Sequence, residues 1–212
     1  MLYTLLDIPH VLEPVCSQVL SAMHTLVQKT SGSVLLLAMK VLLTVLDKEV
    51  TLYEDHVKGF QTEMIDVLKK VHTFDGIRLA VQCIMKLVNN YCLETPWAAI
   101  TVCNLIESCL QNVRGLSHEQ QSPMVLHECR RSIIILGQIY EKLNIHSYTM
   151  ISNLKEWRVD IVAASLEVIF LNTHYEPIIR MHALEASLQC RLNSYGKLSD
   201  GVLHEIENVR YE

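Results

Sequence analysis

Residues 34–46 read VLLLAMKVLLTVL, and residues 76–88 read GIRLAVQCIMKLV. Seven pairs of residues in the two stretches, Leu35/Ile77 and Leu42/Ile84 among them, match in character at an offset of 42 residues. The segments that follow them match at the same offset, so that Phe60 corresponds to Val102 and Met64 to Ile106. Two helix-type patterns therefore alternate and repeat together, which is typical of a helical solenoid.

Prolines and short polar stretches divide the chain into about nine helical patterns, the last of which ends near Val209. Within each pattern the apolar residues recur every three or four positions, as on one face of an α-helix. Pro96 and Pro177 fall where the first turn of a helix tolerates proline, and Asp75 is the expected N-cap of the helix that follows it. We therefore expect an all-α fold of about four two-helix units that forms a single helical-repeat domain over residues 1–212.

Several segments resemble known helical-repeat families. The stretch DGIRLA at 75–80 resembles the start of the second helix of a HEAT repeat, and PIIRMHAL at 177–184 resembles a less regular copy. The 42-residue period and PWAA at 96–99 are similar to armadillo repeats instead. The resemblance implies a right-handed α-solenoid of armadillo/HEAT-like units. The armadillo proteins that hold nuclear-localisation peptides carry a repeated Trp and Asn ladder that this chain lacks, so import-receptor function does not carry over.

The composition limits the classes of partner. The net charge is −5, which argues against a nucleic-acid binder, because such proteins normally carry a basic stripe. Half of the residues are hydrophobic and only 19% are charged. Together with the lack of clearly polar end caps, this favours an array whose apolar surface is covered by the rest of a longer chain or by a complex.

The sequence shows no membrane segment and no secretory signal. The most apolar run is interrupted by Lys40 and stops at Asp47, well short of the roughly 18 apolar residues that span a bilayer. The seven cysteines include no CxxC pair. They indicate reduced thiols in an intracellular compartment, either the cytoplasm or the nucleus.

No catalytic motif can be assembled from the sequence. It contains no GxSxG elbow, no glycine-rich phosphate loop and no dinucleotide fingerprint. The only candidate metal ligands match no common zinc module in their spacing, and buried thiols explain the cysteines among them better. We therefore expect no enzyme activity, no metal and no cofactor. These candidate ligands are Cys103, Cys109, His118, His127 and Cys129.

The repeat also predicts a binding surface. In the helix over 34–47 the core stripe contains Leu35, Leu42 and Leu46, and another stripe lies more than about 100° away from it. Equivalent places in a solenoid should be equally exposed, so we expect the second stripe to face solvent, and the HEAT resemblance places it in the concave groove. The alternative is that its apolar members are buried under the N-terminal helix. The predicted partner-binding residues are Leu36, Lys40, Leu43, Arg78, Gln82, Met85 and Asn89.

Two functions remain open. The first is a non-enzymatic protein-interaction scaffold that binds a peptide or helix of a partner protein. The alternative is a nucleic-acid-associated helical-repeat module within a larger complex, which would need a basic concave face. The sequence gives no basis for an oligomeric state.

Overall fold

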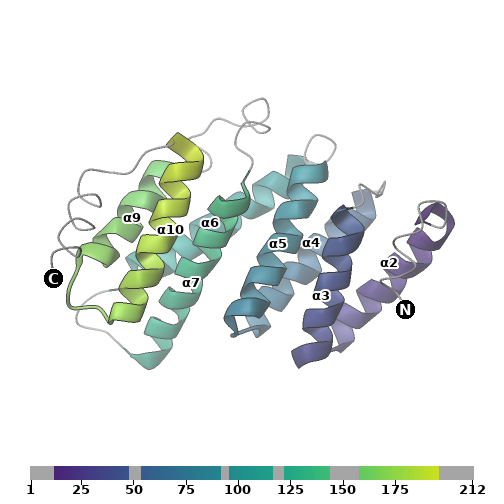
Figure 1. Cartoon of the computed structure of the whole chain (residues 1–212), viewed down its shortest axis with the longest axis horizontal. Coiled ribbons are helices and arrows are strands. Elements are labelled where there is room, and N and C mark those ends of the chain that lie inside the picture. The colour runs from purple at the N-terminus through teal and green to yellow at the C-terminus, as the bar shows by residue number, and fades with distance from the viewer. Residues whose placement is uncertain (1–11, 48–53, 92–95, 117–121, 144–157, 196–212) are drawn as a thin grey trace. The chain divides into compact units, whose positions relative to one another are not determined.

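The computed structural model describes residues 12–47, 54–91, 96–116, 122–143 and 158–195. These residues form eight α-helices and no strand, which confirms the all-α prediction (Figure 1). The ninth pattern, near residues 201–209, lies outside the described residues. None of the described helices is long and apolar enough to cross a membrane. The helices are α2 (Leu12–Lys29), α3 (Gly32–Asp47), α4 (Glu54–Lys70), α5 (Phe74–Tyr91), α6 (Pro96–Arg114), α7 (Pro123–Lys142), α9 (Val159–Leu171) and α10 (Pro177–Tyr195).

The chain divides into two compact units, residues 1–100 and 101–212, and α6 crosses the division. In the first unit α2 packs against α3 and α4, and α5 packs against α3 and α4. In the second unit α10 packs against α9 and α7. A helix thus meets both its neighbour in sequence and the equivalent helix of the adjacent pair, as in stacked two-helix repeats. The fold is therefore helical-repeat-like, whereas the handedness and the single continuous array stay predictions.

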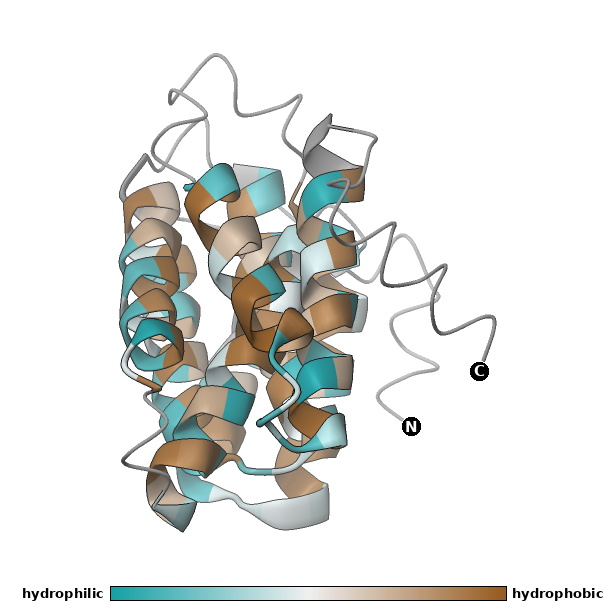
Figure 2. Ribbon diagram, turned by 90° about the vertical axis from the view of Figure 1, so that its left-hand side faces the viewer, coloured by the Kyte–Doolittle hydropathy of each residue, from teal (hydrophilic) through white to brown (hydrophobic). Residues whose placement is uncertain are grey.

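The core includes the main apolar stripes that the repeat pattern predicted. Phe60, Met64, Val102 and Ile106 are fully buried, as the 42-residue correspondence between their segments requires. The described helices carry hydrophobic and hydrophilic residues together, as expected of helices that are only partly covered (Figure 2). Burial of these apolar stripes is the main stabilising contribution, since helix propensity alone rarely holds helices of this length in water.

The helix boundaries have local chemical causes. Gly32 has a φ of +58°, a left-handed conformation that glycine adopts without strain, and it begins α3 directly after the turn from α2. Ser122 caps α7, because its hydroxyl oxygen accepts a hydrogen bond from the Val125 amide and Pro123 follows it. The expectation that Asp75 caps α5 is wrong: the hydroxyl oxygen of Thr73 accepts the hydrogen bond from the Gly76 amide, and Asp75 lies inside the first turn.

Candidate functional site

The predicted stripe lies on α3 and α5, two helices that pack side by side in the first unit. Lys40 and Arg78 are exposed. The other members, apart from Met85, are half-buried, so six of the seven residues reach the surface on two adjacent helices. We call this surface the α3–α5 face, and it consists of Leu36, Lys40, Leu43, Arg78, Gln82 and Asn89.

Met85 is only 1% exposed, so its predicted place on the surface is wrong. Val81 and Val88, one turn before it and one turn after it on α5, are also fully buried. These three side chains form a second buried edge of α5, which narrows the exposed arc of that helix. Leu43 is the counterpart of Met85 in the preceding copy of the repeat, and it is half-buried on α3. Equivalent positions are therefore not equally covered in the two copies.

Polar contacts hold α3 and α5 in register beside this face. The Lys86 ammonium lies 2.7 Å from Asp47, and the Asn90 amide donates to the carbonyl oxygen of Leu46 at 3.0 Å. Deeper in the interface the Cys83 thiol lies 3.6 Å from the Met39 carbonyl oxygen. Exposed ion pairs contribute little stability, so the value of these contacts lies mainly in fixing the geometry of the face.

The cysteines behave as core side chains. Five of them have side chains that the structure describes, and these five are free thiols. Cys83, Cys109, Cys129 and Cys190 are buried, whereas Cys103 is half-buried. Burial raises the pKa of the Cys109 and Cys190 thiols to about 12 and that of Cys129 to about 11. Such thiols stay protonated near neutral pH and are poor nucleophiles.

The candidate metal ligands are not brought together where they are described. No group of three or more His, Cys, Asp or Glu side chains in the described part of the chain is arranged to hold a metal ion. His118 falls among residues 117–121, outside that part. The expectation of a chain without metal therefore stays a prediction.

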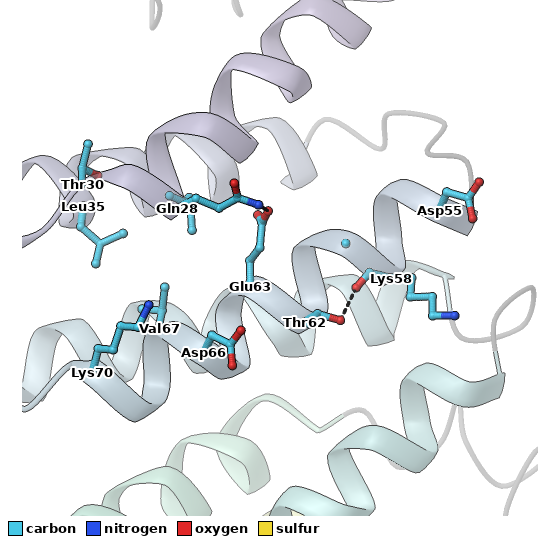
Figure 3. A pocket seen from close by; sticks show the side chains of 12 residues that line it. Gln28, Thr30, Leu35, Asp55, Lys58, Thr62, Glu63, Asp66, Val67 and Lys70 are labelled. Carbon is cyan, nitrogen blue, oxygen red and sulfur yellow. Dashed lines mark hydrogen bonds between the residues drawn. The ribbon is translucent and has the colours of Figure 1, made fainter.

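The structure adds a pocket that sequence reasoning missed. It lies between α2 and α4, has a volume of about 590 Å³, and is lined by Glu63 and Gln28 among others (Figure 3). Glu63 follows Phe60 by three residues and precedes the buried Met64. A carboxylate next to a core position was thus the only feature of the sequence that could have indicated this pocket. That signal is weak, because most such carboxylates lie on a solvated helix face.

No protein-family model, no curated protein and no solved structure matches this chain. The armadillo/HEAT resemblance therefore stays an expectation that rests on the residues themselves.

Proposed function

We propose that the chain is a non-enzymatic interaction scaffold that binds a peptide or helix of a partner protein on the α3–α5 face. The observation that carries the proposal is the position of Leu36 and Leu43. Both are half-buried apolar side chains on α3, which packs against α5, and the exposed Lys40 lies one turn from each of them on the same helix. Protein interfaces commonly combine such an apolar centre with a polar rim.

The rigidity of the face supports the same function. The contacts of Lys86 with Asp47 and of Asn90 with Leu46 join the two helices at the C-terminal end of α3. A surface that is ordered before binding loses less conformational entropy when the partner docks. We propose further that the two units continue one right-handed solenoid of armadillo/HEAT type, and that the protein works in a reducing intracellular compartment.

The charges near the face favour a protein partner over a nucleic acid. Arg78 lies 3.3 Å from Asp75, and Lys86 lies 2.7 Å from Asp47, so acidic neighbours offset two of the cations on this side of the helices. Binding to a phosphate backbone draws on several cations whose charge is not already balanced.

The test is a comparison of variants in partner capture. Leu43→Gln removes an apolar contact from the face without adding a charge, and Lys40→Glu reverses the charge beside it. Leu171→Gln is the matched control, because Leu171 is 44% exposed on α9 in the other unit. A partner at a hot spot should lose about 2 kcal/mol of binding free energy with Leu43→Gln, which is roughly thirtyfold in affinity.

Proteins identified by mass spectrometry should be held by the wild-type chain and by Leu171→Gln and lost with both face variants. A partner that both face variants retain would contradict the assignment of the face. Salt-sensitive binding to duplex DNA or RNA, with no protein captured, would favour the nucleic-acid module instead.

A further inference from the structure

We propose that the pocket between α2 and α4 is a second binding site, which takes the protonated side chain of an arginine or lysine from a partner polypeptide. Glu63 is the residue that binds the cation. The pocket lies outside the α3–α5 face, so the inference goes beyond the proposed function. It depends on that function only in one respect, that a bound polypeptide carries the cation.

The Glu63 side chain is unusually buried and unevenly hydrogen-bonded for a carboxylate. Its side chain is 10% exposed, and both of its hydrogen bonds go to the same oxygen. The Nδ1 of His24 lies 2.6 Å from Oε1, and the Gln28 amide donates to Oε1 at 2.7 Å. The second oxygen, Oε2, is buried and accepts no hydrogen bond from the described residues.

A buried carboxylate oxygen without a donor is costly, and it is rare in folded proteins. A guanidinium or ammonium group would supply the missing donor together with a compensating charge, which makes the hydrogen bond short and strong. Glu63 also lines the pocket, so a cation that displaces the Gln28 amide there would meet the carboxylate. The geometry therefore favours a cation with N–H donors over a neutral or anionic ligand.

The two donors on the α2 side differ in how closely they are packed. The His24 ring stacks on Phe60 with ring centroids 3.9 Å apart. A Cβ on Gly59 would lie 2.8 Å from the ring, so this glycine is what allows the ring to lie there. Gln28 is exposed, and Figure 3 shows its amide over the Glu63 carboxylate. Gln28 is thus the group that moves aside when a cation enters, whereas His24 stays in place.

The remaining charges of the pocket are mixed. Asp55 and Asp66 line it with Glu63, against Lys58 and Lys70. The Lys69 ammonium lies 2.8 Å from Asp66, and its hydrogen bond lowers the pKa of that carboxyl. The Lys58 ammonium points away from Glu63 (Figure 3). The volume of about 590 Å³ exceeds the needs of one long side chain and suits a side chain with part of its backbone.

The test titrates the whole chain with small capped amino acids and follows the side-chain amide signals of Gln28 by NMR. N-acetyl-arginine amide and N-acetyl-lysine amide should shift these signals, with dissociation constants of about 1 to 10 mM for so small a probe. N-acetyl-citrulline amide has nearly the shape of the arginine probe but no charge, and it should leave them unchanged. Equal shifts from arginine and citrulline, or shifts from inorganic phosphate alone, would overturn the proposal.

Two variants test whether Glu63 is the residue that binds the cation. Glu63→Gln keeps the shape of the side chain and should weaken arginine binding by about tenfold or more, because a charge-assisted hydrogen bond is lost. Asp66→Asn is the matched control within the pocket and should change binding by less than about threefold, since Lys69 already balances Asp66. Equal losses in the two variants would mean that only the overall charge matters, and would refute the role of Glu63.

A third variant, Gln28→Ala, tests the proposal even if Glu63→Gln disturbs the packing of α2 on α4. Gln28 is exposed, so the variant should fold normally, and removing the group over the carboxylate should leave arginine binding equal or tighter. Because Gln28 is absent from this variant, binding of the arginine and lysine probes is followed by the NMR signals of Thr62 and Val67, which also line the pocket. Loss of binding in this variant would contradict the entry route. These probes do not address the α3–α5 face, so the two proposals can fail separately.

Discussion

Leu37 and Leu79 occupy the same place in two consecutive copies of the repeat, yet Leu37 is 55% exposed and Leu79 only 6%. Leu79 lies one turn before Cys83, whose thiol reaches the Met39 carbonyl oxygen, so it is on the side of α5 that faces α3. The corresponding side of α3 is the side away from α5. Exposure in this fold therefore depends on the position of a copy in the stack as well as on its sequence.

This difference predicts unequal costs for the same substitution. Leu79→Ala removes buried methyl groups and leaves a cavity, so it should lower the free energy of unfolding by about 2 to 3 kcal/mol. Leu37→Ala should change it by no more than about 0.5 kcal/mol, since the side chain is largely in water already. Urea unfolding followed by circular dichroism compares the two. Equal losses would mean that Leu37 is covered in solution.

The burial of Met85 leads to a second prediction. Met85→Glu places an unpaired charge in the core, and it should destabilise the protein by more than about 3 kcal/mol. Gln82→Glu introduces the same charge on the same helix at a half-exposed position, and it should cost less than about 1 kcal/mol. Thermal melts of the two variants test this. If Met85→Glu melts within a few degrees of the wild-type chain, then Met85 does belong to the α3–α5 face after all.

The buried thiols should be slow to react. Cys83, Cys109, Cys129 and Cys190 are buried, and burial raises the pKa of each thiol above its usual range. Native protein at neutral pH should therefore leave these four unlabelled by a thiol reagent, while unfolding should make all seven cysteines titratable. Mass spectrometry of labelled peptides identifies the sites. Stoichiometric zinc that survives dialysis against a chelator would instead indicate a metal site.

The same thiols predict how stability depends on pH. In the folded protein the pKa of Cys190 is raised to about 12 from an ordinary 9.0. Below pH 9 the thiol is protonated in both the folded and the unfolded chain, so it does not make the free energy of unfolding depend on pH there. Above pH 9 the unfolded chain ionises first, and stability falls by about 1.4 kcal/mol per pH unit for each such thiol until the folded pKa is reached. Urea unfolding between pH 8 and about 10.5 measures this slope. Cys190→Ala should make it shallower, and an unchanged slope would contradict the assignment.

Gly137 marks a close approach of α7 to α10. A Cβ at this position would lie 3.1 Å from the Ala186 Cβ and 3.2 Å from its Cα. Gly137→Ala should therefore destabilise the protein by about 1 kcal/mol, although alanine in place of an unhindered helical glycine stabilises by a similar amount. Adding Ala186→Gly should recover part of the loss, and a double-mutant cycle in urea measures that coupling. A gain in stability from Gly137→Ala alone would show that the helices can separate without cost.

Local patterns along the sequence predicted the helices well. The stripe of Val162, Leu166 and Ile169 lies on one side of α9 and is buried, as its spacing indicated. The position of a helix N-cap was predicted less well, because Thr73 and Asp75 are both good capping residues and lie only two positions apart. Which of the two becomes the N-cap depends on the backbone conformation of the preceding turn, and the sequence pattern does not specify that conformation.

The sequence alone predicted the helices of the described residues, their main buried stripes such as Leu35, Leu42 and Leu46 on α3, and the alternation of two helix patterns every 42 residues in the first half of the chain. These properties follow from the period of the α-helix, and they depend on residues close together in the chain. The packing of the helices was needed to show that Met85 is covered, that Leu37 is exposed, and that Glu63 meets His24 and Gln28 across α2 and α4. Each of these depends on which helices lie beside a given side chain, and such neighbours come from parts of the chain that a local pattern does not reach.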